Sequence, residues 1–96
     1  MSTDNAHAMI QQATQLVEVK LREHPDFRPL LSIKAQLAYL TDYISRVAEG
    51  SRLKDINIGL VAAREIEGWD DDLANLLHQI AVQVRILQMA DALKNQ

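Results

Sequence analysis

The sequence predicts an all-α protein, a small antiparallel four-helix bundle, and three observations lead to this fold class. Apolar residues recur at alternating spacings of three and four along most of the chain, which is the pattern of helices with one buried face. No segment alternates apolar and polar residues over the length of a strand. The three glycines and two prolines are isolated, so they divide the chain into helical segments. The length of 96 residues suits one hydrophobic core, and we expect a single domain over residues 1–96.

The first two predicted helices are separated by a proline-containing break. The first runs from about Asp4, a candidate N-cap, to about Glu23, and Pro25 disfavours its continuation. The second runs from about Pro29 to Glu49, with Gly50 just past its end. The apolar residues of the first helix are Ala6, Ile10, Ala13, Val17 and Leu21, and those of the second are Leu30, Ile33, Leu37, Leu40, Ile44 and Val47.

The last two predicted helices differ in how their apolar residues are arranged. The third, from about Arg52 to Ile66, has two apolar lines, so we expect it to be sandwiched or to present a stripe to a partner. The fourth, from about Asp71 to Lys94, has one regular seam. Because the connections are short, neighbouring helices should run antiparallel in an up-down-up-down bundle with one short member. The lines of the third helix are Leu53, Ile56, Leu60, Ala63 and Ile58, Ala62, Ile66; the seam of the fourth is Leu73, Leu77, Ile80, Val84, Leu87.

Composition limits the compartment and the partners. The chain has no cysteine, so disulfides and thiolate metal sites are excluded, and a reducing cytoplasm is the natural compartment. The N-terminus lacks a secretory pattern, and no stretch approaches the roughly 20 apolar residues that span a bilayer. A net charge of −3 argues against nucleic acid, since phosphate binding relies on concentrated Lys and Arg. We therefore expect a cytoplasmic protein that binds neither membrane nor nucleic acid.

The residues that would support catalysis are scattered. His7, His24 and His78 lie in three different segments without the spacing of metal ligands. The glycines are isolated and form no loop that could cradle a phosphate. We therefore predict no enzymatic activity and no cofactor, and a function in binding another protein.

One short segment concentrates negative charge without a compensating base. Between residues 65 and 72 the local charge is −5, so the remainder of the chain sums to +2. Asp70, Asp71 and Asp72 fit a helix start, where carboxylates cap the backbone and favour the dipole. Glu65 and Glu67 oppose the dipole of the preceding predicted helix, so both a solvated turn and a docking patch for a basic partner stay open. The five carboxylates are Glu65, Glu67, Asp70, Asp71 and Asp72.

Trp69, the single tryptophan, lies inside this acidic segment. It either packs near Ala74 to staple the helix entry or serves as an aromatic anchor for a partner. A second candidate surface is a stripe on the second helix, beside its buried seam, which is either an interface or a cover for the core edge. The stripe consists of Ser32, Gln36, Tyr39, Tyr43 and Arg46.

A series of positions along the chain carries a resemblance to a known family through its order and spacing. These positions are Pro25-x-Phe27, Leu30-Leu31-Ser32, Gln36-Leu37-x-Tyr39-Leu40, then Gly59, Ala62, Glu65, the acidic connection, Leu73 and Leu77. Over roughly residues 10 to 90 the chain resembles the small helical immunity proteins of bacterial type VI secretion that neutralise an NAD(P)+ glycohydrolase toxin. The resemblance implies an all-helical fold, cytoplasmic residence, no catalysis and a 1:1 complex that covers the toxin's active cleft.

The leading hypothesis is inhibition by occlusion of a cognate effector toxin, in which the acidic segment and the tyrosine stripe dock on a basic substrate pocket. The alternative is a helical adaptor or a self-associating module unrelated to toxins. In that alternative, a homodimer would form through the two apolar lines of the third helix.

Overall fold

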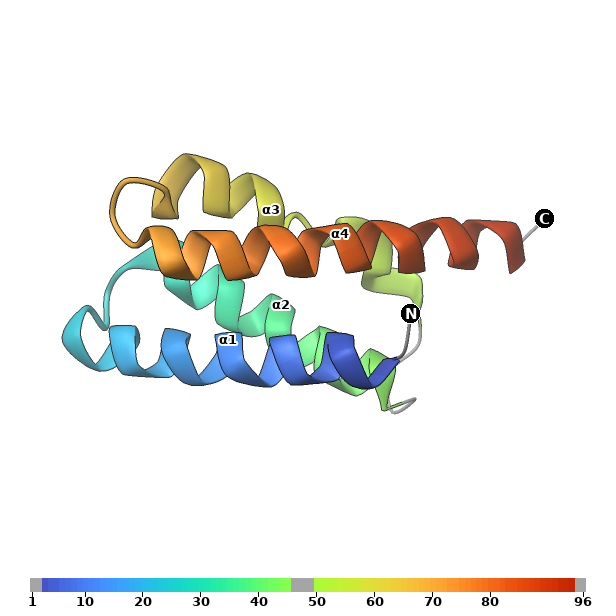
Figure 1. Cartoon of the computed structure of the whole chain (residues 1–96), viewed down its shortest axis with the longest axis horizontal. Coiled ribbons are helices and arrows are strands. Elements are labelled where there is room, and N and C mark those ends of the chain that lie inside the picture. Colours follow the sequence, from blue (N-terminus) through green and yellow to red (C-terminus); the bar gives the residue numbers. More distant parts are fainter. Residues whose placement is uncertain (1–2, 46–49, 95–96) are drawn as a thin grey trace.

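The helices of the chain lie along one long axis and reverse direction at each connection (Figure 1). The computed structural model describes residues 3–45 and 50–94. α1 begins and α4 ends at the same end of the molecule (Figure 1). The expected all-α antiparallel bundle is thereby confirmed. Its elements are α1 (Thr3–Glu23), α2 (Arg28–Ile44), the 3₁₀-helix η1 (Gly50–Asp55), α3 (Ile58–Val61), the π-helix η2 (Ala62–Ile66) and α4 (Asp71–Lys94).

The core consists of the apolar faces that the helical spacing predicts. α1 packs on both α2 and α4. The short third segment, which consists of η1, α3 and η2, packs on α4 from another side. All side chains of the core cluster are apolar, so burial of hydrocarbon is what holds the helices together. The buried residues of this cluster are Ile10, Ala13, Val17, Leu30, Ile33, Leu37, Leu40, Leu53, Ile58, Ala62, Ile66, Leu73, Ala74, Leu77, Ile80 and Val84.

α2 starts where the proline pattern predicts and ends earlier than expected. Phe27 is extended at the N-cap position, and Pro29 lies in the first turn, where a missing N–H costs nothing. Ser45 leaves the helical conformation with ψ near 1°. Gly50 opens η1 and does not close α2, so the predicted end at Glu49 is wrong. The predicted core residue Val47 lies outside the described residues.

The prediction of a single third helix is also wrong, because this part of the chain is divided into η1, α3 and η2, with a break between η1 and α3. Asn57 has φ −131° and ψ 32°, and its backbone N–H donates to Gln36 Oε1 at 2.9 Å. Gln36 Nε2 in turn donates to Asn57 Oδ1 at 2.8 Å. The first of these bonds satisfies a backbone N–H that a continuous helix would have bonded internally, and the second ties the Asn57 side chain to α2.

The break also changes which apolar residues face outward. Ile58, Ala62 and Ile66 are buried in the bundle, whereas Leu60 is 49% exposed and stands on the outer side. One of the two apolar lines proposed for a homodimer is therefore part of the chain's own core.

The end of the third segment is adapted to a close crossing and a tight turn. Gly59 lies so near α4 that a Cβ there would be 2.8 Å from the Cβ of Ala81. The backbone then widens into a π turn, in which the N–H of Glu67 donates to the carbonyl oxygen of Ala62 at 2.9 Å. Within the described ranges, no helix is both long and apolar enough to cross a bilayer, and no cluster of three metal-ligating side chains is present.

Candidate protein-binding surfaces

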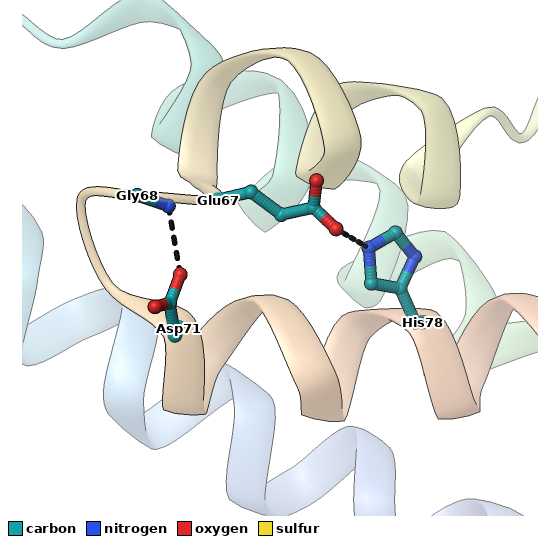
Figure 2. A network of polar contacts seen from close by, with 4 residues as sticks. All are labelled: Glu67, Gly68, Asp71 and His78. Atoms are coloured by element: carbon teal, nitrogen blue, oxygen red, sulfur yellow. Dashed lines mark hydrogen bonds and ion pairs between the residues drawn. The ribbon is translucent and has the colours of Figure 1, made fainter.

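The acidic turn, residues 65–72, is folded by two of its own aspartates. Gly68 has a positive φ of 83°, which a residue without Cβ adopts at little cost, and its N–H donates to Asp71 Oδ1 at 2.7 Å (Figure 2). Asp70 Oδ1 accepts the N–H of Leu73 at 3.1 Å, which is the N-cap bond of α4. The predicted capping role is therefore confirmed for Asp70, and Asp71 fixes the turn.

Other parts of the chain reduce the negative charge that the sequence places here. Lys20 Nζ on α1 lies 3.5 Å from Asp70 Oδ2. Glu67 Oε1 and His78 Nε2 on α4 are 2.9 Å apart and form a hydrogen bond across the turn (Figure 2). Within the described part of the chain, Glu65 and Asp72 are exposed and have no such partner. The acidic turn thus combines carboxylates that hold the fold with carboxylates that face solvent.

Trp69 packs on the connection between α1 and α2. Its ring centroid is 5.1 Å from that of Phe27 and 5.3 Å from that of His24, and Lys20 Nζ lies 5.4 Å from it. The side chain remains 41% exposed. The sequence suggested a staple on Ala74, which stays a prediction, and it did not indicate these three partners, which lie more than 40 residues away along the chain. Trp69 therefore ties the acidic turn to the other connection at this end and still offers an open face.

The tyrosine stripe on α2 is present, but its polar residues are already engaged. Gln36 Nε2 also donates to Ser32 Oγ at 3.1 Å, in addition to its bonds with Asn57. The rings of Tyr39 and Tyr43 stack with centroids 6.3 Å apart, and both are half-buried. Arg46, the last predicted member of the stripe, lies outside the described residues.

The environment of Tyr43 disfavours its ionised form. Burial raises the pKa of the Tyr43 phenol, and the negative charge of Asp91 and the neighbouring Tyr39 raise this pKa further. Tyr43 is thus close to Asp91, near the C-terminal end of α4.

The structure does not bring the two predicted surfaces together. Asp71, in the acidic turn, and Asp91, beside Tyr43, are both on α4 and 20 residues apart. At 1.5 Å per residue this separation is about 30 Å. The acidic turn and the tyrosine pair are therefore at opposite ends of the bundle.

Sequence reasoning missed a third surface, on the outer side of α4. The outer stripe consists of Val82, Ile86, Met89 and Leu93, which are 58%, 51%, 63% and 70% exposed. Beside it, a groove of about 470 Å³ runs between α4 and the η1–α3 segment. The sequence shows this spacing of four, three and four. The prediction for the helix considered only its regular buried seam, so the outer stripe was missed. The groove is lined by Ile56, Ile58, His78, Ala81, Val82, Val84, Arg85 and Gln88.

Comparison with known proteins gives one match, to a family. The family model described as Tsi6 matches residues 5–86 of the chain. Neither the curated proteins nor the solved structures give a match. The matched segment includes the tyrosine pair, the whole acidic turn and the first half of the outer stripe.

Proposed function

The chain belongs to the Tsi6 family of type VI secretion immunity proteins, and from this premise we propose that it binds and inhibits one effector whose toxin domain is an NAD(P)+ glycohydrolase. Tsi6 itself is immunity to an effector of that activity. In this proposal the protein acts in the cytoplasm, catalyses nothing and works by covering the toxin's active site.

The observation that carries the proposal is the exposed part of the acidic turn. Glu65 and Asp72 project into solvent beside Trp69, which keeps an open aromatic face. A pocket that binds a dinucleotide must hold its phosphates, so it presents positive charge. Complementary charge speeds the encounter of two proteins, and a desolvated tryptophan slows their dissociation. The acidic turn has both properties at one end of a narrow molecule.

The tyrosine stripe enters the proposal as a contact outside the toxin's pocket. Because about 30 Å of α4 separates it from the acidic turn, both surfaces reach one toxin only if the partner extends along the bundle. Tyr39→Ala tests this contact separately. If the variant folds normally and its affinity for the toxin is unchanged, the stripe lies outside the interface.

The experiment that tests the function measures NAD+ hydrolysis by the toxin domain of the cognate effector, with increasing amounts of this protein. We expect hydrolysis to stop at about one equivalent, and inhibition to weaken as NAD+ is raised, because both compete for one site. Undiminished hydrolysis at a molar excess of this protein would remove the proposal. Inhibition that is independent of NAD+ concentration would remove occlusion alone.

The role of charge is tested with exposed carboxylates that do not hold the fold. Reversing Glu65 and Asp72 to lysine should slow association and reduce its salt dependence. The matched control reverses Glu18 and Asp42, which are exposed on α1 and α2 and change the net charge equally. Equal association rates for the two double variants would show that net charge, and not the acidic turn, governs the encounter.

A further inference from the structure

The C-terminal half of α4 is apolar on two sides. Its inner seam is buried in the core, while the outer stripe of Val82, Ile86, Met89 and Leu93 faces solvent. These four residues follow the spacing of four, three and four, so they form a straight ridge about 17 Å long. A contiguous exposed patch of this kind on a small protein marks an interaction site more often than scattered apolar residues do.

The groove beside this ridge contains one charged lining residue. Arg85 is exposed at its edge, and within the described residues no carboxylate lies in ion-pair distance of it. The other titratable lining residue, His78, is already bonded to Glu67. The rest of the lining is apolar except for Gln88, whose Nε2 donates to the carbonyl oxygen of Leu53 at 2.9 Å. An occupant that suits this groove therefore has apolar side chains and one carboxylate for Arg85.

A second copy of the chain meets these requirements poorly. The outer stripe contains no acidic residue, and Asp91, the carboxylate nearest to it in the sequence, lies close to Tyr43 on the other side of α4. The largest apolar patch on a typical monomer exposes about 300 to 600 Å², and the outer stripe, with four side chains, is a patch of this kind. A stable interface buries about 800 Å² on each partner. Two stripes paired with each other would fall short of that area and leave Arg85 without a partner.

A partner that covers the whole outer side of α4 would bury more of the chain than the stripe alone. Asp71 and Val82 are 11 residues apart, close to three full turns, so the acidic turn and the outer stripe lie on one continuous side of the helix. We propose that the outer stripe and the Arg85 groove bind a helix of the effector that presents apolar side chains and a carboxylate, while the acidic turn covers the pocket. This inference rests on the proposed function and adds a second surface of the chain to the interface with the effector.

Calorimetry of binding to the toxin domain of the cognate effector tests the inference. The double variant Ile86→Ser with Met89→Ser should raise Kd by about 10- to 100-fold, since two anchors lose their burial. The matched control is Val19→Ser with Leu31→Ser, two residues that are each 47% exposed on α1 and α2. The control should bind as the wild type does.

Charge gives an independent readout. Arg85→Glu should raise Kd at least about tenfold, because it places two carboxylates opposite each other, whereas Arg64→Glu, an exposed arginine on η2, should not. Unchanged affinity of the stripe variant with intact inhibition would overturn this inference and leave the proposed function standing. A wild type that neither binds nor inhibits the toxin would overturn both. A wild-type dimer that the stripe variant converts to a monomer would assign the stripe to a second copy and also overturn the inference.

Discussion

Removing the side chain of Asp70 should destabilise the fold more than removing any other carboxylate of the acidic turn. Asp70→Ala deletes the N-cap bond to Leu73, which typically contributes about 1 kcal/mol and up to about 2. It also deletes the ion pair with Lys20, at 3.5 Å, which adds roughly 0 to 1 kcal/mol because both groups are partly solvated. The free energy of unfolding should therefore fall by about 1 to 3 kcal/mol.

The measurement is urea unfolding followed by the fluorescence of Trp69, the single tryptophan, which packs against the α1–α2 connection. Asp70→Asn keeps a capping oxygen and loses the charge, so it should retain most of the stability. Asp72→Ala, at an exposed position, should change stability by less than about 0.5 kcal/mol. Equal losses for Asp70→Ala and Asp72→Ala would refute the division between carboxylates that hold the turn and carboxylates that face solvent.

Three further predictions concern other parts of the fold. Gly59→Val should cost about 2 kcal/mol of stability in denaturant unfolding, because its Cβ would overlap that of Ala81, and Ala81→Gly in the same chain should recover part of the loss. Gln36→Leu should cost about 1 to 2 kcal/mol and accelerate amide hydrogen exchange over residues 50–57, and unchanged exchange would show that the amide pair does not hold the break. The pKa of Tyr43 should exceed the ordinary value of about 10 in a titration of phenolate absorbance, and Asp91→Asn should lower this pKa. Since the folded pKa is the higher one, the stability from neutral Tyr43 is complete below the unfolded pKa and is lost as pH rises through the folded pKa.

Local pattern was sufficient where packing follows helical periodicity. The seam from Leu30 to Leu40 is fully buried as predicted, because residues three and four apart necessarily share one face of a helix. The start of α4 was equally accessible, since an aspartate before an apolar run is a local capping signal. These features depend on residues within one or two turns of each other.

Two features that sequence reasoning did not predict involve partners that are distant in the chain. The break at Asn57 depends on Gln36, 21 residues earlier, and no local propensity reveals that an amide of α2 will replace helical hydrogen bonds. Trp69 packs on Phe27 and His24, which lie on the α1–α2 connection, because the antiparallel topology puts this connection and the acidic turn at one end of the bundle. The outer stripe of α4 differs from these features, because its helical spacing is visible in the sequence. A helix that is apolar on two sides indicates a face without a partner inside the bundle.

The arrangement of the acidic turn has an evolutionary consequence. Asp70 and Asp71 are tied to the backbone that surrounds them, so their replacement changes the fold before it changes recognition. Glu65 and Asp72 have no such ties, and substitutions at exposed, unbonded positions are nearly neutral for stability. A lineage can therefore change the charge that it presents to an altered toxin without first acquiring a compensating stabilising mutation.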